Sequence, residues 1–433
     1  MQDIHLYKGA IFYFTDSPSE KNEASVYISD GALVVENGIV LETAPYNKLK
    51  HKYTNVQVVD YSGYLIMPGL IDAHVHYPQT EMIGMYGRQL LDWLSEYTFP
   101  VEIAFNSFDH ALKIAHSFIR ELLRNGTTSC VAYSTVHTTS VDALFQAASD
   151  CNMRIITGKT LMDQNAPESL LESVKICERE SMELIEKWHH TGRNSYAIAP
   201  RFAITSSPGQ LRMAARLHEL FPDTYIQTHL SENENEIKNA LAIHPPHSDY
   251  LDVYEKAGLI TNRTLLGHCI HLSESEINRL ASACAIAVHC PTSNLFLGSG
   301  LFDMQRFNLA NVQTVIATDV GAGTSFSMFK TMGAAYTIAQ QTGYAMPVLE
   351  TFYKSTLGTA KALALDDKIG SFKPGNEADF IVVDLAATPI QQIRSDFLKQ
   401  NAKWSIENQL FGLQIQGDDR NIIATYLMGK KVY

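Results

Sequence analysis

Four histidines and one aspartate are the residues of this 433-residue chain whose types and spacing best suit metal chemistry. Each lies at the end of a short apolar run, and the five are His74, His76, His229, His268 and Asp319. The strands of a parallel barrel bring the residues at their ends to one rim, where such enzymes carry their active sites. The pattern therefore predicts a metal-dependent hydrolase.

His74 and His76 form a His-x-His pair after the apolar run that starts at Ile66. Residues two apart on an extended strand project from the same face, so both imidazoles can bind one ion. An isolated pair is weak evidence, because this spacing is common by chance. The joint occurrence of His229 and Asp319 at the ends of other apolar runs is the stronger signal. We predict these four residues as the metal ligands, although Asp319 could instead cap a helix.

The predicted donor set indicates one metal ion per subunit. Three imidazole nitrogens and one carboxylate oxygen suit Zn²⁺, and Fe²⁺ or Mn²⁺ accept similar sets. Zinc lowers the pKa of a bound water to about 7, which provides hydroxide at neutral pH. Lys159 falls on the third predicted strand and the fourth offers no lysine, so a lysine bridging two metals is not expected. His289 and Cys290 also end a strand, and we expect them to support the site without binding the ion.

Glu232 and His268 are the residues predicted to act on protons and charge beside the metal. Glu232 follows a predicted ligand by three residues and is assigned as the proton shuttle, since a general acid must lie within hydrogen-bond reach of the reacting centre. The alternative is a solvated residue or a charge in the first turn of a helix, which we adopt for Glu234 and Glu236. His268 is expected to orient the water and stabilise the developing oxyanion, and Asp319 to accept a proton from that water.

The elements that must position these residues alternate between short β-branched runs and helical stretches, which is typical of repeated βα units. Eight strands close a barrel, so we predict an α/β fold with a (β/α)8 TIM-like barrel over residues 67–369. The predicted strands are 66–76, 127–133, 154–162, 195–202, 225–229, 264–268, 285–289 and 313–319. The predicted helices include 108–124, 166–188, 210–221 and 274–283, where apolar residues recur at three and four positions.

The two ends of the chain are predicted to build one small β-sandwich domain. Residues 1–66 alternate polar and apolar residues, and Asn37-Gly38 is a strong hairpin signal. Residues 370–433 contain the turn residues of 370–375, a strand at 378–384 and a strand, turn, strand pattern at 423–430.

Composition narrows the range of partners. Apolar residues make up 45% of the chain and charged residues 18%, and the formal net charge of -12 argues against binding nucleic acid. A small-molecule substrate is therefore expected. The sequence has neither an apolar run long enough to span a membrane nor a signal-peptide pattern, so we expect no membrane association and a cytoplasmic protein. The 6 cysteines form no Cys-x-x-Cys pair, which favours buried reduced thiols.

At these residues the chain resembles the amidohydrolase superfamily and, more closely, its guanine deaminases. The superfamily resemblance rests on residues 68–76, on the later ligands, and on the segment 375–380. The narrower resemblance rests on Gln79, 91–100, 200–202, 229–232, 289–295 and 417–420, and covers nearly the whole chain.

The resemblance implies that the predicted ligands hold zinc and that guanine is surrounded by Gln79, Arg201, Phe202, Glu232 and His268. Guanine offers O6 and N7 as adjacent acceptors, which suit the arginine fork of Arg201, while Gln79 faces the amide side and Phe202 packs on the ring. The implied reaction is hydrolytic deamination in purine catabolism. Hydroxide attacks C2, Glu232 protonates N3, and Asp319 relays a proton to the departing amine, giving xanthine and ammonia. The resemblance also suggests a homodimer.

Two other functions are compatible with parts of this pattern. A related deaminase or hydrolase could act on another purine, a pyrimidine or a triazine, since such enzymes share the metal set. A non-catalytic scaffold relative would have lost its ligands, whereas every predicted ligand is present here. The other zinc deaminase fold is disfavoured, because its His-x-Glu and Pro-Cys-x-x-Cys signature is absent.

Overall fold

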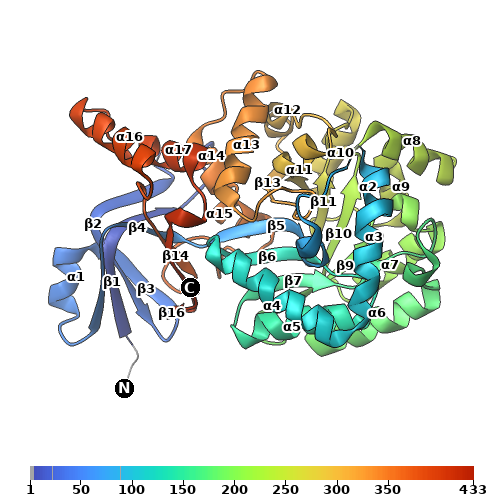
Figure 1. Ribbon diagram of the computed structural model, residues 1–433, viewed down its shortest axis with the longest axis horizontal. Helices are drawn as coiled ribbons and strands as arrows, with labels where there is room; N and C mark the ends of the chain where they lie inside the picture. Colours follow the sequence, from blue (N-terminus) through green and yellow to red (C-terminus); the bar gives the residue numbers. More distant parts are fainter. Residues whose placement is uncertain (1–3, 22, 88) are drawn as a thin grey trace.

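A computed structural model describes residues 4–21, 23–87 and 89–433 (Figure 1). The chain forms a parallel barrel, and a separate sheet built from the two chain ends lies beside it (Figure 1). Both parts of the predicted fold class are thus confirmed. The exact domain limits, 1–66, 67–369 and 370–433, stay a prediction.

Eight parallel strands form the barrel in the order β13-β12-β11-β10-β9-β7-β6-β5. Backbone bonds join its two edge strands, since Asp319 N donates to His74 O at 2.9 Å and His76 N donates to Val320 O at 2.6 Å. The short β8 pairs with β9 outside this order. The strands are β5 (Leu70–His76), β6 (Thr127–Tyr133), β7 (Arg154–Gly158), β8 (Thr160–Leu161), β9 (Asn194–Pro200), β10 (Tyr225–Leu230), β11 (Thr264–His268), β12 (Ile286–His289) and β13 (Gln313–Ile316).

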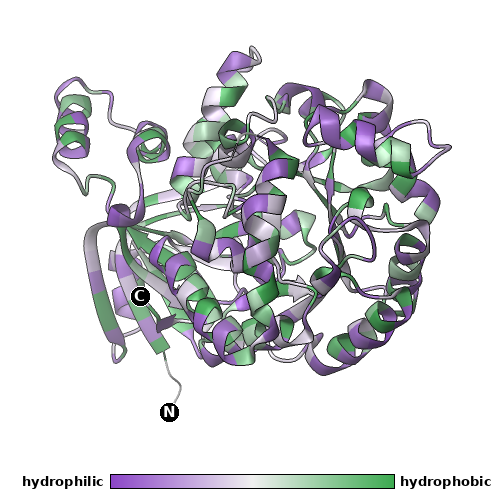
Figure 2. Cartoon of the chain, turned by 45° about the vertical axis from the view of Figure 1, so that its right-hand side comes forward, coloured by the Kyte–Doolittle hydropathy of each residue, from purple (hydrophilic) through white to green (hydrophobic). Residues whose placement is uncertain are grey.

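Helices surround the barrel, and Figure 2 shows that they carry both hydrophilic and hydrophobic residues. The predicted bounds of α4 and α10 agree with the structure, and α4 buries Ala111, Ile114, Ala115 and Phe118, which recur at three and four positions. The helices are α4 (Phe108–Arg124), α5 (Thr138–Asp150), α6 (Val174–Trp188), α7 (Pro208–Leu220), α8 (Glu234–Ile243), α9 (Tyr250–Ala257), α10 (Glu274–Ala283), α11 (Pro291–Phe296), α12 (Met304–Leu309), α13 (Met328–Gln341), α14 (Val348–Tyr353) and α15 (Leu357–Ala362), with short 3-10 turns η4 (Glu168–Leu170) and η5 (Ala203–Thr205).

A long excursion separates β5 from the first barrel helix, and we call it the β5–α4 segment, residues 77–107. It holds η1 (Tyr77–Met82), α2 (Leu90–Trp93), the π-helical turn η2 (Leu94–Thr98), α3 (Phe99–Ile103) and η3 (Ala104–Asn106). Because the segment starts directly after the His-x-His pair, it begins at the rim where the site must lie.

The chain ends contribute one seven-stranded sheet in the order β16-β15-β14-β4-β1-β2-β3. Asn37 and Gly38 join β2 to β3 with φ angles of 51° and 83°, which confirms the predicted hairpin. The elements are β1 (Ile4–Phe14), β2 (Ser25–Glu36), β3 (Ile39–Pro45), α1 (Tyr46–Lys52), β4 (Gln57–Pro68), β14 (Phe380–Val383), η6 (Asp419–Asn421), β15 (Ile422–Leu427) and β16 (Lys430–Lys431).

Two helices interrupt the C-terminal part of this sheet, and the sequence patterns did not predict them. They are α16 (Pro389–Gln400) and α17 (Ile406–Gln416). Helix α17 packs against α13, whereas α16 extends away from the body at the upper left of Figure 1. Across the described ranges, every helix is too short or too polar to cross a lipid bilayer.

Candidate active site

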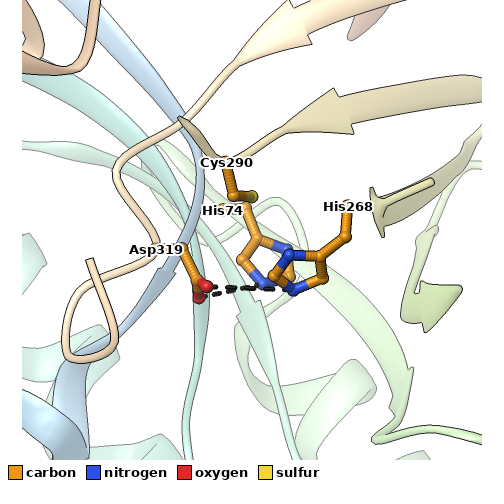
Figure 3. A group of neighbouring side chains, drawn as sticks. All are labelled: His74, His268, Cys290 and Asp319. Carbon is orange, nitrogen blue, oxygen red and sulfur yellow. Dashed lines mark ion pairs between the residues drawn. The ribbon is translucent and has the colours of Figure 1, made fainter. Parts of the chain in front are cut away.

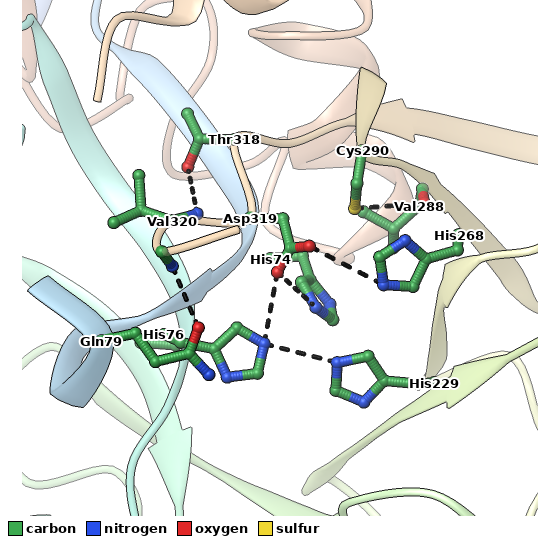
Figure 4. A network of polar contacts seen from close by, with 12 residues as sticks. His74, His76, Gln79, His229, His268, Val288, Cys290, Thr318, Asp319 and Val320 are labelled. Atoms are coloured by element: carbon green, nitrogen blue, oxygen red, sulfur yellow. Dashed lines mark hydrogen bonds and ion pairs between the residues drawn. The ribbon is translucent and has the colours of Figure 1, made fainter. Parts of the chain in front are cut away.

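Four predicted metal ligands converge at the C-terminal ends of three barrel strands (Figure 4). The two histidines of the His-x-His pair come from β5, His229 from β10, and Asp319 lies three residues after the end of β13. Oδ1 of Asp319 is 3.3 Å from Nε2 of His74 and 3.3 Å from Nε2 of His76. Nε2 of His229 is 3.3 Å from Nε2 of His76. Residues up to 245 positions apart in the chain therefore present their donor atoms to one point.

These separations match the geometry of a tetrahedral zinc site. Donors bound at about 2.0–2.1 Å and tetrahedral angles lie about 3.3 Å from one another. Nε2 of His74 is buried and has no hydrogen-bond partner among the described residues, a situation that is costly unless a ligand occupies the centre. The donor set, three nitrogens and one oxygen, thus fits a single divalent ion.

The protonation states of the imidazoles favour binding of a cation. Burial lowers the pKa of His76 to about 4, and burial together with the neighbouring histidines lowers the pKa of His229 well below its usual value. Both rings are therefore neutral at physiological pH, the form in which histidine binds metals. Nδ1 of His229 donates to the carbonyl of Arg201 at 2.7 Å, which leaves the lone pair of Nε2 directed at the other donors.

A second grouping of possible ligands combines His74, Asp319, His268 and Cys290 (Figure 3). The Cys290 thiol donates to Val288 O at 3.6 Å, and burial raises its pKa well above the usual value. His268 Nε2 is 3.8 Å from Asp319 Oδ2, farther than the edges of the first grouping. A protonated thiol is a poor ligand, so the histidine-rich grouping is the better metal site.

Asp72 holds the two edges of the site together, although its role was not predicted. Its carboxylate accepts hydrogen bonds from the backbone of Thr318 at 3.0 Å, from the Thr318 hydroxyl, and from the backbone of His74 at 3.4 Å. One residue thereby joins the end of β5 to the residue before Asp319. Gly267 leaves room for the His74 ring, because a Cβ at this position would lie only 2.7 Å from Cε1 of His74.

Glu232 and His268 lie side by side above this cluster. Their closest atoms, Oε2 and Nε2, are 3.4 Å apart, and the other Glu232 oxygen accepts from the Ser299 hydroxyl at 2.9 Å. Burial, followed by the charge of Asp319, raises the pKa of Glu232 to about 8. Glu232 is therefore protonated at neutral pH, which is the state that a general acid requires.

His268 has a defined hydrogen-bond partner. Its Nδ1 donates to Oδ1 of Asn294 at 2.9 Å, so its Nε2 is the atom that can accept a proton or a hydrogen bond from the reacting centre. His268 and Asp319 also have left-handed backbone, with φ of 70° and 52°, and such conformations of non-glycine residues concentrate at functional sites.

A small pocket opens over the donor cluster and is lined by both apolar and polar side chains, as is typical of a small-molecule site. The β5–α4 segment lines one side of the pocket with Gln79, Leu90, Trp93 and Leu94. The other substrate-binding residues predicted by resemblance line the pocket from later parts of the chain. Its lining comprises His76, Gln79, Leu90, Trp93, Leu94, Arg201, Phe202, His229, Glu232, Glu236, His268, Ser293, Leu297, Asp319 and Ala322. All the predicted site residues except His74 line this pocket, and His74 lies directly beneath it among the metal donors.

Sequence comparison decides the family. The model of the amidohydrolase family matches residues 65–432. The chain is 47% identical to the guanine deaminase of Escherichia coli (strain K12) over 419 residues, which cover 96% of this chain and 94% of the relative. The chain belongs to the guanine deaminases of the amidohydrolase family. The human guanine deaminase is 33% identical, and the alignment covers 84% of this chain and 82% of the human protein.

Solved structures of guanine deaminases superpose closely on this amidohydrolase. The structure of E. coli guanine deaminase superposes with a TM-score of 0.96 at 46% identity and covers 99% of both chains. The guanine deaminase from C. acetobutylicum with bound guanine superposes with a TM-score of 0.88 at 29% identity, covering 99% of this chain and 100% of that chain.

Sequence reasoning missed several residues of this amidohydrolase that support its site. Asp72 and Asn294 lie within motifs that carried the resemblance, but no spacing rule identified their partners. Glu102 on α3 had no signal of its own, yet both of its carboxylate oxygens accept from Arg201. Glu236 was interpreted as a solvated residue or a first-turn charge. It does lie in the first turn of α8, but it is buried rather than solvated, and it accepts from the backbone of Glu232 at 2.8 Å.

Lys159 lies away from the metal donors, in agreement with its exclusion as a bridging ligand. Its ammonium group is buried between the carboxylates of Glu172 at 2.7 Å and Glu180 at 2.9 Å. This lysine is therefore part of a structural ion-pair group beside β7 and α6.

Proposed function

We propose that this chain hydrolyses guanine to xanthine and ammonia in purine catabolism. The guanine deaminases among its relatives support this function, as does a related structure described with guanine bound. The observation that carries the proposal is the buried Glu232 carboxyl 3.4 Å from His268, beside the four convergent metal donors. An acid, an acceptor and a metal site in one pocket are the parts that a hydrolytic deamination needs.

The ion is one Zn²⁺ per subunit, held by His74, His76, His229 and Asp319. The donor separations of 3.3 Å support this assignment. When bound, zinc supplies a hydroxide nucleophile at neutral pH and polarises the reacting centre. Fe²⁺ and Mn²⁺ accept a similar donor set, so the metal content of purified protein decides between them.

The side chains then divide the proton movements. Glu232 donates its proton to N3 while a C–O bond forms at C2, and the Nε2 atom of His268 accepts a hydrogen bond from the attacking oxygen. Asp319 transfers a proton from that oxygen to the exocyclic nitrogen, the C2–N bond breaks, and ammonia leaves. The water that next enters the site returns a proton to the Glu232 carboxylate as it ionises, so one water and one guanine are consumed, and xanthine and ammonia are formed, without any oxidant or reductant.

Guanine recognition is assigned to the pocket wall. Arg201 donates to O6 and N7, which are adjacent acceptors that match its planar fork. Gln79 faces the ring amide and Phe202 packs on the purine. All three side chains are buried at the pocket, which supports their contact with substrate rather than with bulk water.

The test is the loss of guanine and the appearance of xanthine and ammonia, with and without a chelator. We expect guanine to be turned over and the chelator to abolish turnover. Glu232→Gln should retain its metal and lose most of its rate. Faster ammonia release from adenine, cytosine or a triazine than from guanine would instead assign the enzyme to another substrate.

We also propose a homodimer in the cytoplasm. The dimer is supported by helix α16, which exposes Ile390, Ile393 and Phe397 at a spacing of three and four positions along one face. The cytoplasm is supported by the described cysteines, which are all free thiols. An exposed apolar stripe of this kind is typical of an interface. Ile393→Asp combined with Phe397→Asp should shift the mass measured by light scattering from dimer to monomer, whereas Leu220→Asp on exposed α7 should not. A wild-type monomer would refute the assembly.

A further inference from the structure

A buried glutamate on the β5–α4 segment binds the arginine assigned to guanine recognition. Nη1 of Arg201 donates to both carboxylate oxygens of Glu102, at 2.8 and 2.7 Å. The side chains are 4% and 1% exposed, so water screens the pair very little. The guanidinium also lies 5.4 Å from the ring centroid of Phe99, which precedes Glu102 by three residues on α3. One face of one helix therefore holds Arg201 by both charge and ring contact.

The same carboxylate reaches Gln79. Burial raises the pKa of Glu102, and the charge of Arg201 and a hydrogen bond from the Gln79 side chain oppose that rise. Oε1 of Gln79 accepts from the backbone of Gly321 at 3.1 Å. The amide oxygen is therefore directed at Gly321 and the amide nitrogen at Glu102, which fixes the orientation of the Gln79 amide.

These contacts leave a defined part of each recognition group for a ligand. Nη1 of Arg201 is occupied by Glu102, whereas Nε and Nη2 have no acceptor among the residues that the structure describes. Arg201 lines the pocket, so those two groups are the donors that a purine edge can meet. A guanidinium has five N–H donors in a rigid fork, and fixing one end fixes the direction of the rest.

We propose that Glu102 is a positioning residue for guanine specificity, which acts by orienting both Arg201 and Gln79. This inference rests on the proposed deamination of guanine. Glu102 does not line the pocket and takes no part in the proton movements. Its function is to hold the two side chains that discriminate a purine with an oxygen at C6 from one without it.

The physical reason is preorganisation. An arginine without its carboxylate samples several rotamers and must be ordered again by each substrate. Its buried charge is also left without compensation, which disfavours the buried position of the guanidinium at the pocket. The loss should therefore appear in substrate binding and discrimination, while the metal, Glu232 and His268 are unchanged.

The experiment compares Glu102→Gln with wild type on guanine and on 2-aminopurine, which has the reactive amine but lacks the C6 oxygen. We expect the guanine KM to rise about 10- to 100-fold, the size of one lost hydrogen bond to a charged group, with kcat changed less than about threefold. The KM for 2-aminopurine should rise less than that for guanine, since 2-aminopurine keeps N7 but offers no O6 to Arg201. Glu377→Gln is the control, because Glu377 forms partly buried ion pairs with Arg154 and Arg193 away from the pocket.

Further variants keep the test decisive. If Glu102→Gln does not fold, Glu102→Asp retains the charge but is one methylene shorter, and the same rise in guanine KM is expected. In an Arg201→Met background, Glu102→Gln should cause a smaller further loss of preference for guanine over 2-aminopurine than it causes in the wild type, because only the effect through Gln79 remains. A wild-type guanine KM and preference in the folded Glu102 variant would overturn the inference. Absence of guanine turnover by the wild type would instead refute the proposed function.

Discussion

Nδ1 of His268 lies 2.9 Å from Oδ1 of Asn294, and this bond selects which nitrogen of His268 faces the reacting centre. An amide oxygen can only accept, so a neutral His268 carries its ring proton on Nδ1 and its lone pair on Nε2. That lone pair faces Glu232 at 3.4 Å. The side chain of Asn294 therefore sets the tautomer of a residue to which we assign a catalytic role.

Asn294→Leu tests this relationship, because leucine has a similar size but cannot accept a hydrogen bond. We expect kcat for guanine to fall about 10- to 100-fold, which is typical for loss of an orienting partner, with the metal content unchanged. Ser282→Ala on the exposed side of α10 serves as the control. Turnover at the wild-type rate would show that His268 does not need Asn294.

Asp72→Asn tests how the metal site is held at the closure of the barrel. The substitution removes the charge that accepts from Thr318 and from the His74 backbone, so the two edges that carry ligands should separate slightly. Zinc affinity should fall about 10- to 100-fold in competition with a chelating dye. Asp60→Asn changes an exposed carboxylate that also accepts from backbone, and it should bind zinc like the wild type.

Metal removal should destabilise the folded protein. The donor atoms of His74, His76 and His229 lie close together, and the buried Nε2 of His74 has no hydrogen-bond partner among the described residues. A bound ion would satisfy these donor atoms. Zinc at 100 times its Kd should raise the free energy of unfolding by about 2.7 kcal/mol, seen as a higher midpoint in thermal unfolding. His229→Gln should eliminate most of the increase, and His51→Gln should retain it. Equal melting with and without zinc would contradict the site.

The stability of the metal-free protein should depend on Glu236 in a defined direction of pH. Burial, followed by the charge of Glu232, raises the pKa of Glu236 from 4.5 to about 7. The folded state thus holds a proton that the unfolded state releases above pH 4.5. Stability from this group is complete below pH 4.5 and is lost as the pH rises through 7.

Glu236→Gln isolates this contribution, since the buried histidines act in the opposite direction below pH 6.5. The free energy of unfolding should be measured with urea at pH 5, 6, 7 and 8. Relative to the variant, the wild type should lose about 2.5 kcal/mol across this series. A constant difference between the two proteins would mean that Glu236 is not protonated in the folded state.

The barrel and its ligands could be predicted because both depend on local signals. The strands 127–133 and 264–268 and the helices 108–124 and 274–283 have the observed bounds, since each is a strongly patterned run between clear end signals. His74, His76, His229 and Asp319 were identifiable because parallel strands must end at one rim. These four residues could be identified from where each predicted strand ends, without knowing which residues they contact in the fold.

The supporting residues depend on contacts that no local pattern encodes. Glu102 and Arg201 are 99 positions apart, and only the folded β5–α4 segment brings them together. Helix α16 was missed for a different reason. It leaves Ile390, Ile393 and Phe397 exposed rather than packed on the sheet, and it interrupts a region whose flanking residues read as strands.

The β5–α4 segment is an insertion between the strand and the helix of the first βα unit, and it carries Gln79, Trp93 and Glu102. Part of the recognition wall is consequently encoded in one stretch of the chain that contains none of the metal ligands. A protein engineer who seeks a new heterocycle as substrate can vary residues 77–107 as one cassette and leave the hydrolytic centre intact. Natural divergence of substrate choice on this scaffold has the same route open to it.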